Sequence, residues 1–574
     1  MIRQWFKSGT PWIWMNAGAV SIALVAVLGL LLLIMLRGMS HFWPADVNLF
    51  QFENKAGAAT IIAEIIEKET VPADTIPGME KMPGNITRYL VKTGNRDIFG
   101  SDFRWIFEAG LKSLTQPAGL MVLERTEWGN FYGYLTAVYE SEKVISRLVR
   151  PDSGELKSAP LKELKSAPLK TENINADQLL AEFNQRLERV IDIREKISDL
   201  ERGEIGAINY KLERLRLKQR RFQLDKTLTE DIINEIEAER QQLEQEYAQL
   251  IKKTEALYKQ IKRDSIRAII MDGREISISI DKIVKAWQPN GMSTLQKLSF
   301  YFSDLAGFIT EDPREANTEG GIFPAIFGTV MMVILMSMLV TPFGVVAAVY
   351  LREYAKQGVL IRLIRIAVNN LAGVPSIVYG VFGLGFFVYF LGGHIDDLFY
   401  PEAQPAPTFG TPGLLWSSLT LALLTLPVVI VATEEGLSRI PRSLREGSLA
   451  LGATKIETLW RVVLPMASPA IMTGLILAVA RAAGEVAPLM LVGVVKLAPA
   501  LPLDGNMPFL HLDRKFMHLG FHIYDVGFQS PNVEAARPLV YATAFLLVVV
   551  IVALNLSAIS LRNRLREKYR ALDG

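Results

Sequence analysis

Six long apolar stretches constrain this chain more strongly than any other feature of its sequence. A helix that crosses the hydrocarbon core of a membrane needs about 20 mostly apolar residues. Six segments meet this requirement, and the expected spans are about Ala17–Leu36, Ile322–Tyr350, Leu371–Leu391, Leu414–Thr433, Ile471–Val495 and Pro538–Ile559. The sequence therefore predicts an α-helical integral membrane protein with six transmembrane helices.

The first apolar stretch has two interpretations, a cleaved signal peptide and a retained membrane anchor. Its apolar run is longer than the core of a typical signal peptide. The residues directly after it, Arg37–Ser40, offer no small-x-small cleavage site. We expect a retained anchor.

Basic residues outside the spans set the expected orientation, because lysine and arginine gather on the cytoplasmic side of a membrane protein. They precede the first span and follow the second, fourth and sixth spans, so all four groups share one side if both termini are cytoplasmic. The expected domains are a tail and first helix at 1–36, an external (periplasmic) domain at 37–321, a transmembrane domain at 322–560 and a cytoplasmic tail at 561–574. We expect a multi-pass protein of the inner (plasma) membrane, with membrane lipid as a partner.

The charge balance and the absence of cysteine exclude several classes of function. The 62 basic and 60 acidic residues leave a net charge of +2, which is too small an excess to attract nucleic acid. A chain without cysteine has no disulfides, no thiolate metal ligands and no cysteine nucleophile.

The expected external domain contains strand-like segments rich in branched and aromatic residues. Asp272-Gly273 between two of them is a strong signal for a β-hairpin. The segments are Ile86–Val91, Leu120–Glu124, Phe131–Tyr139, Ile266–Met271 and Glu275–Ile280.

A long helical stretch at about 176–263 interrupts these strands. Apolar residues recur in it at intervals of seven among many charged residues, which predicts a coiled coil. They are Ile208, Leu215, Phe222, Ile236, Leu243, Leu250 and Leu257. Gly203, Gly206 and the segment Asp225–Glu230 are candidate breaks. We expect an antiparallel helical hairpin on a β-rich base, and the alternative is one long helix.

Just before the coiled coil, the octapeptide Glu155–Lys162 is repeated without change as Glu163–Lys170. A perfect tandem repeat with serine, alanine and proline is typical of a duplicated linker. We expect an exposed connection that tolerates insertion.

The segment 434–469 between the fourth and fifth spans carries the most informative motif. One interpretation is a pair of amphipathic helices at the membrane surface. Its spacing also resembles the EAA loop of ABC importer permeases, with Gly447-Ser448 in place of two alanines. The residues that carry this resemblance are Arg445, Glu446, Gly447, Ser448, Gly452, Leu464 and Pro465.

This resemblance implies that the loop is a coupling element that docks in a cleft of a separate ATPase subunit. No phosphate-binding motif G-x-x-x-x-G-K-[ST] occurs in the chain. The chain is therefore expected to be a transport subunit without catalytic residues, and the partner is expected to bind ATP and Mg²⁺.

Three further stretches resemble phosphate ABC transporter permeases of the PstA type. They are Asn370–Gly380, Ala480–Leu489, and the pair Glu319–Ile322 with Tyr350–Tyr354 on either side of the second span. The resemblance extends over about Glu319–Arg570. It implies a type I importer permease core, a second permease of the PstC type, an ATPase dimer of the PstB type and a periplasmic phosphate-binding protein of the PstS type.

Three polar residues near these stretches are candidates for the substrate pathway. Arg481 and Glu485 are four residues apart, and an ionic pair within a span usually faces a cavity or a partner. They either form a structural ion pair or take part in phosphate binding, since arginine binds phosphate bidentately. Ser376 after Pro375 offers a hydroxyl to an anion, or alternatively caps a helix.

Four residues before the sixth span have a weaker metal-binding pattern. His518 and His522 are spaced to share a helix face, with His511 and Asp513 nearby. Because no third ligand has clear spacing, we expect no metal site.

Two other functions compete with phosphate import. The first is a permease for another oxyanion, such as sulfate or phosphonate. The second is an envelope sensor or scaffold, in which the external coiled coil takes part in phosphate signalling with a regulator.

Overall fold

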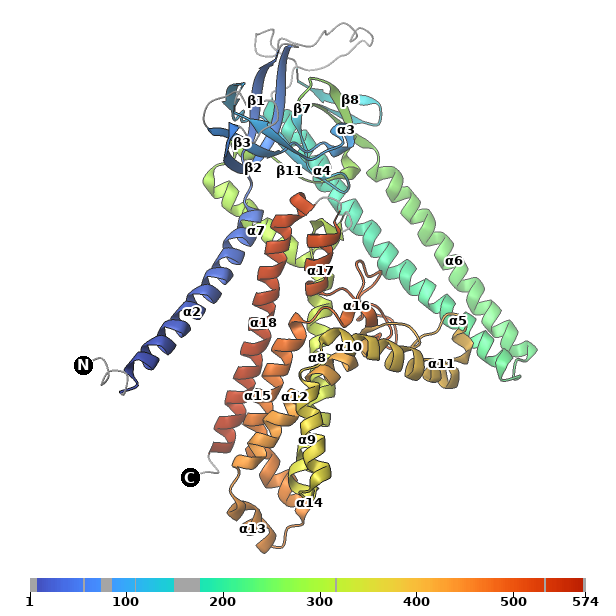
Figure 1. Ribbon diagram of the computed structural model, residues 1–574. Helices are drawn as coiled ribbons and strands as arrows, with labels where there is room; N and C mark the ends of the chain where they lie inside the picture. Colours follow the sequence, from blue (N-terminus) through green and yellow to red (C-terminus); the bar gives the residue numbers. More distant parts are fainter. Residues whose placement is uncertain are drawn as a thin grey trace. The chain divides into compact units, whose positions relative to one another are not determined.

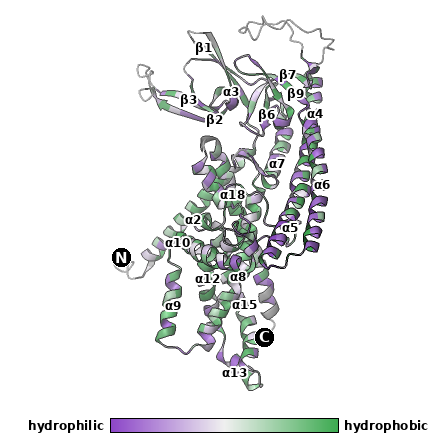
Figure 2. Cartoon of the chain, turned by 90° about the vertical axis from the view of Figure 1, so that its right-hand side faces the viewer, coloured by the Kyte–Doolittle hydropathy of each residue, from purple (hydrophilic) through white to green (hydrophobic). Residues whose placement is uncertain are grey.

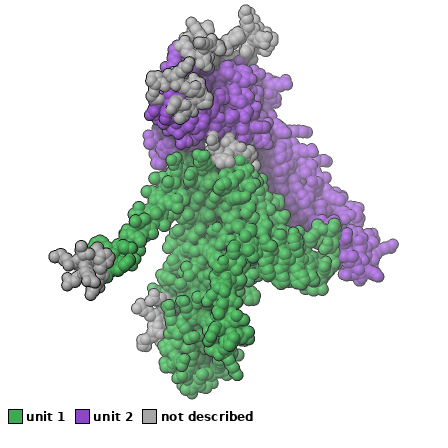
Figure 3. All heavy atoms as spheres, viewed as in Figure 1, with its two compact units in different colours: residues 1–41, 308–574 green, residues 42–307 purple. Residues whose placement is uncertain are grey.

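The computed structural model describes residues 8–54, 57–73, 85–108, 110–148, 176–314, 317–530 and 533–570. The chain divides into two compact units (Figure 3), one formed by Phe42–Gly307 and the other by Met1–His41 together with Phe308–Gly574. The expected external domain of 37–321 is longer at both ends than the Phe42–Gly307 unit. The tandem octapeptide at 155–170 lies outside the described residues.

The Phe42–Gly307 unit contains two antiparallel sheets (Figure 1). The first has the order β4-β3-β2-β1-β5 and consists of β1 (Val47–Asn54), β2 (Gly57–Pro72), β3 (Asn85–Lys92), β4 (Phe103–Phe107) and β5 (Leu111–Thr115). The second has the order β10-β9-β7-β6-β11 with β8 paired to β7, and consists of β6 (Met121–Arg125), β7 (Phe131–Glu140), β8 (Lys143–Arg147), β9 (Asp264–Ile269), β10 (Glu275–Ser279) and β11 (Ile283–Trp287). The short helix α3 (Arg96–Phe99) follows β3.

The five segments predicted as strands form β3, β6, β7, β9 and β10, which confirms those predictions. Asp272-Gly273 joins β9 and β10 in an antiparallel hairpin, and Gly273 has a φ of +83°. Left-handed backbone of this kind favours glycine because glycine lacks a Cβ.

The helical stretch forms a hairpin, so the prediction of an antiparallel pair is confirmed and the single long helix is wrong. Its first arm comprises α4 (Ala176–Ser198), a π-helical turn (Asp199–Ile205) and α5 (Gly206–Leu224), and its second arm is α6 (Glu230–Ile261). The two arms are joined after Asp225, and neither Gly203 nor Gly206 interrupts the first arm. Figure 2 shows that these arms are predominantly hydrophilic.

The first arm has two different packing environments along its length. Beyond the π-helical turn, Ile208 and Leu215 pack against Ile236 and Leu243 of the second arm. Before it, α4 instead covers the second sheet with a buried stripe that comprises Leu179, Phe183, Leu187, Val190, Ile193 and Ile197. The first part of the stretch predicted as coiled coil at about 176–263 therefore also belongs to the core of the β-rich base.

The other unit contains six helical segments that are long and apolar enough to cross a membrane, counted over the described residues. They are Pro11–Phe42, Phe323–Tyr354, Ser376–Phe399, Leu414–Arg439, Lys455–Gly484 and Ala536–Arg564. The helices outside the Phe42–Gly307 unit, with the connecting helix α7, are α2 (Thr10–Met39), α7 (Thr294–Thr310), α8 (Phe323–Val349), α9 (Val359–Leu371), α10 (Ser376–Phe382), α11 (Gly393–Phe399), α12 (Leu414–Arg439), α13 (Arg442–Ala450), α14 (Lys455–Thr458), α15 (Leu464–Gly484), α16 (Leu489–Val492), α17 (Leu519–Tyr524) and α18 (Val533–Arg570). The strands β12 (Pro313–Arg314) and β13 (Glu319–Gly320) pair just before α8.

Helix α12 packs against α8 and α15, and small residues allow these helices to approach closely. A Cβ at Gly344 of α8 would meet the Val429 side chain of α12, and a Cβ at Gly474 of α15 would meet Ala432. Small residues at such contacts are typical of helix packing in membranes, where the hydrophobic effect does not drive association.

Candidate functional site

The loop between the fourth and fifth spans forms two short helices, α13 and α14, which meet at Gly452. The Gly452 N–H donates to the carbonyl of Leu449 at 3.0 Å, and its φ is +88°. A glycine in this conformation ends a helix without steric strain. Thr454 then starts α14, and its hydroxyl accepts from the N–H of Glu457.

Arg445 attaches this loop to the end of the second span. Its guanidinium lies 2.9 Å from the Glu353 carboxylate and donates to the carbonyls of Leu437 and Ile440, each at 2.8 Å. Both side chains of the ion pair are largely buried. Lys455 adds a second attachment, because its ammonium donates to the Glu353 carbonyl at 2.6 Å.

The two short helices are also joined to each other. The hydroxyl groups of Ser448 and Thr458 lie 2.9 Å apart, so Ser448 links α13 to α14. Glu446 and Gly447 lie on the exposed side of α13. Leu464 and Pro465 directly follow the π-helical turn Leu459–Val463, within a helical stretch that runs from Lys455 to Gly484.

The exposed surface of this loop carries several apolar side chains among its polar ones. Leu451 is 91% exposed and Ile456 is 71% exposed, and Leu449 is exposed as well. Apolar side chains grouped on a surface usually mark a place where another protein binds.

The break at the end of the fifth span corrects the predicted span of Ile471–Val495. Helix α15 ends at Gly484, and Glu485 has extended backbone with φ −79° and ψ 132°. Arg481 therefore lies in the last helical turn and Glu485 just beyond it. Their side chains still pair, with Arg481 Nε 3.5 Å from Glu485 Oε1, and both remain partly exposed.

Segments of the third and fifth spans meet at this break. A Cβ at Gly380 would lie 2.7 Å from the Cα of Pro488, so α10 packs directly on the chain after Glu485. Tyr379 lies within electrostatic range of Arg481, and its hydroxyl donates to the Leu371 carbonyl at 2.6 Å. The structure thus brings together two of the three stretches that carry the resemblance to phosphate permeases, Asn370–Gly380 and Ala480–Leu489.

Ser376 is the first residue of α10 and is half-buried. Its hydroxyl makes no capping bond, because Pro375 occupies the N-cap position. The alternative of simple helix capping by Ser376 is therefore wrong.

The three histidines before the sixth span each contact a different partner. His511 Nε2 lies 2.9 Å from Asp504, His518 Nδ1 accepts from the Gly520 N–H, and His522 Nδ1 lies 3.4 Å from the Thr543 hydroxyl. Burial lowers the pKa of His518 to about 3 and that of His522 to about 4. Among the described residues, no three histidine or acidic side chains come together in a group that could hold a metal ion.

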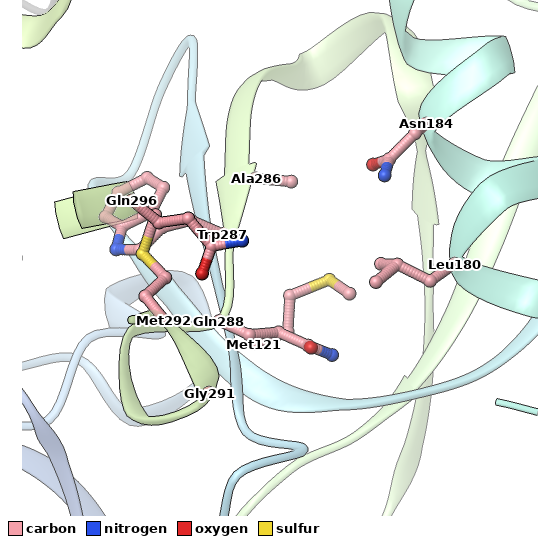
Figure 4. A pocket seen from close by; sticks show the side chains of 9 residues that line it. All are labelled: Met121, Leu180, Asn184, Ala286, Trp287, Gln288, Gly291, Met292 and Gln296. Carbon is pink, nitrogen blue, oxygen red and sulfur yellow. The ribbon is translucent and has the colours of Figure 1, made fainter. Parts of the chain in front are cut away.

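A pocket of about 310 Å³ lies in the Phe42–Gly307 unit (Figure 4). Asn184 and Leu180 reach it from α4, Trp287 from β11 and Gln296 from α7, while Met121 of β6 lies between them. Amide and apolar groups line it without a charged side chain, so it offers no ionic partner to an anion.

Two residues at the site were not singled out by sequence reasoning. Glu353 and Lys455 hold the loop, and neither belongs to the residues expected to couple. Glu353 lies 92 residues before Arg445, so no local spacing connects them. A buried cation requires a nearby acceptor, which is the signal that would have prompted a search for this carboxylate.

Comparisons with known proteins identify the membrane unit. Residues 340–571 match the family described as binding-protein-dependent transport system inner membrane component. The chain is 31% identical over 241 residues to the probable ABC transporter permease protein YqgH of Bacillus subtilis, covering 41% of this chain and 72% of the relative. It is 36% identical over 247 residues to the phosphate transport system permease protein PstA 1 of Mycobacterium tuberculosis, covering 42% of this chain and 71% of the relative.

This chain matches a larger share of a third relative. The chain is 30% identical over 276 residues to the probable ABC transporter permease protein YqgI of Bacillus subtilis, which covers 47% of this chain and 84% of the relative. The family match begins after the Phe42–Gly307 unit, which is additional to the shared region. The chain belongs to the binding-protein-dependent transport system inner membrane components, as an ABC importer permease of the PstA type.

Proposed function

We propose that this chain is a permease subunit of an ATP-driven importer of inorganic phosphate. The observation that carries the proposal is the meeting of α10 with the break after α15, where Tyr379 of α10 lies within electrostatic range of the Arg481 that pairs with Glu485. Several relatives are named phosphate transport permeases, which supports phosphate as the substrate.

Arg481 suits a transient contact with phosphate. Its distance of 3.5 Å to Glu485 is long for a charged hydrogen bond, and its side chain is about one-third exposed. A guanidinium held in this way can exchange a carboxylate for a phosphate, to which it donates two parallel hydrogen bonds. Glu485 would then reclaim the arginine when phosphate leaves.

The proposed ATPase partner binds at the loop formed by α13 and α14. The exposed apolar side chains of Leu449, Leu451 and Ile456 support this placement, since they would be covered by a partner. A dimer of PstB-type ATPases, a second permease of the PstC type and a PstS-type phosphate-binding protein complete the proposed importer. The chain itself would neither bind nor hydrolyse ATP.

The proposed orientation places both termini in the cytoplasm and residues 37–321 outside the inner membrane. The basic residues that flank the coupling loop support this orientation, because such residues gather on the cytoplasmic side.

Uptake of radiolabelled phosphate tests the proposal in cells that depend on this importer. Arg481→Gln is expected to abolish uptake with normal assembly, and Arg481→Lys to leave a reduced rate, because lysine keeps the charge and loses the bidentate geometry. Arg564→Gln is the matched control, since Arg564 is exposed near the end of α18 and lies outside the 434–469 segment. Full uptake by Arg481→Gln would remove Arg481 from the pathway.

Competition experiments separate phosphate from other oxyanions. Unlabelled phosphate is expected to suppress uptake, while sulfate and a simple phosphonate are expected to leave it unchanged. If sulfate or phosphonate competes and phosphate does not, the chain is a permease for that other oxyanion.

A further inference from the structure

Helix α7 carries a stripe of exposed apolar side chains. Leu295 is 77% exposed and Phe302 is 58% exposed, and Leu298 and Ile309 are exposed as well. Their spacing of three, four and seven residues places all of them on one side of the helix. Leu305, which is half-buried, continues the same line.

The other side of α7 is fixed to the Phe42–Gly307 unit. Asp304 pairs with Lys285 at 2.8 Å, Lys297 pairs with Asp46, and the rings of Phe300 and Trp287 lie 4.9 Å apart. These contacts determine the rotation of the helix about its axis, so they hold the apolar stripe facing outward. They also engage Lys297 and Asp304, the charged residues of this helix.

Two further contacts connect α7 with the ends of two spans. The ring of Tyr301 lies 6.3 Å from that of Phe42, which is the last residue of the first span. At the other end of the helix, the Phe308 carbonyl accepts from the Ile322 N–H at 2.9 Å, directly before the second span begins. Helix α7 thus contacts the ends of two of the segments that are long and apolar enough to cross a membrane.

The aromatic residues around α7 are those that prefer this depth. Trp43 follows the first span, is 42% exposed and lies 6.2 Å from the Tyr301 ring. Tryptophan and tyrosine are enriched where a membrane meets water, because each combines an apolar ring with a polar group.

We propose that α7 lies in the membrane–water interface, on the side of the membrane that carries the Phe42–Gly307 unit, and that its apolar stripe is covered by lipid acyl chains. Amphipathic helices at this boundary bury their apolar side by about 5–10 Å. The inference does not depend on which solute the importer carries.

The absence of cysteine makes a direct test possible, because a nitroxide label can be attached to one introduced cysteine in the full chain. We would label Leu298→Cys and Phe302→Cys, with Ser299→Cys and Ser303→Cys as matched controls one position further along the same exposed helix. The chain would be placed in nanodiscs of phosphatidylethanolamine and phosphatidylglycerol. Collision rates with oxygen, which enters the bilayer, and with a water-soluble nickel chelate would then be measured.

The ratio of oxygen to nickel collisions is expected to be several-fold higher at 298 and 302 than at 299 and 303. A ratio at 298 and 302 as low as at the controls would show that the stripe faces water, and would overturn the proposal. Low collision rates with both reagents would also overturn it, because they would show that protein covers the stripe. Leu295→Cys repeats the test if either first variant fails to assemble.

Discussion

The guanidinium of Arg445 has three acceptors, and one of them is the carboxylate of Glu353. Because both partners are largely removed from water, the loss of one leaves a charge with little solvent to compensate it. The pair joins the proposed docking loop to the end of the second span. We therefore expect a displacement of the loop to reach this membrane helix through the ion pair.

Glu353→Gln is expected to lower phosphate uptake per ATP hydrolysed several-fold, because Arg445 loses its charged partner and the loop loses its attachment. Uptake and ATPase activity should be measured together in the assembled importer. The double variant Glu353→Arg with Arg445→Glu should regain part of the lost coupling. An unchanged ratio in Glu353→Gln would show that the ion pair does not transmit movement.

The buried histidines predict sensitivity to acid. The pKa values of His518 and His522 in the folded chain, about 3 and about 4, lie below the ordinary value of 6.5. At a pH between the folded-state pKa and 6.5, each histidine is protonated in the unfolded chain and neutral in the folded chain. The stability that the neutral histidines allow is therefore complete above about pH 6.5 and is lost as the pH falls toward 4 and 3. For each histidine, the free energy of unfolding falls by about 1.4 kcal/mol per pH unit between pH 6.5 and the pKa of that histidine in the folded chain.

His522→Gln is expected to reduce the fall in the thermal unfolding midpoint between pH 6.5 and pH 4.5. Midpoints of the purified chain in detergent, taken across this range, would measure the change. His394→Gln is the matched control, since the side chain of His394 is exposed. A variant slope equal to that of the parent would contradict the burial argument.

At the scale of elements, the sequence predicted those helices and turns that depend only on residues close together in the chain. The six spans follow from length and hydropathy, and the hairpin of β9 and β10 follows from Asp272-Gly273. Strands such as β2 lack a regular alternation of apolar and polar residues, and partners distant in sequence determine their pairing. The early end of α15 was missed because Glu485–Pro488 lies within an otherwise apolar run.

Gly452 gives a prediction about the loop as an element. A Cβ there would meet no atom within 4 Å, so conformation and not space restricts this position. Gly452→Val should destabilise the turn by about 1–3 kcal/mol, since branched residues strongly disfavour a positive φ. Uptake per ATP hydrolysed should fall in this variant and stay near the parent value in Gly452→Asn, because asparagine tolerates this conformation.

If Gly452→Val and Gly452→Asn lower uptake equally, the backbone conformation of the turn is not what coupling requires. The requirement would then lie in the absence of any side chain at the docking surface.

At the scale of the molecule, the heptad pattern alone did not reveal that the first arm of the hairpin has two packing environments. The buried stripe of α4 contains Leu179 and Phe183, which pack on the second sheet, whereas beyond the π-helical turn α5 and α6 form a separate apolar cluster. Helical periodicity looks alike in both environments, so the sequence could not separate them. The same limit applies to Arg481, whose neighbour Tyr379 comes from another span.

Removal of the outer part of the hairpin is therefore expected to be tolerated, whereas removal of 176–263 is expected to unfold the base. In the shortened variant, a short glycine-rich turn would replace residues 212–242, so that all of α4 remains. Limited proteolysis of both variants would compare the stability of the base, and phosphate uptake would compare transport. Unfolding of the base in the shortened variant would show that the outer seam supports the sheets.

The hairpin has a mechanical consequence as well. The 32 residues of α6 rise about 48 Å at 1.5 Å per residue, and a second helix braces them over much of that length. Two braced helices resist bending, so a lateral force applied at the turn acts as torque on the base where α4 is buried. A small lateral force at the turn would thus produce a large torque on the sheets, because torque grows with the length of the hairpin.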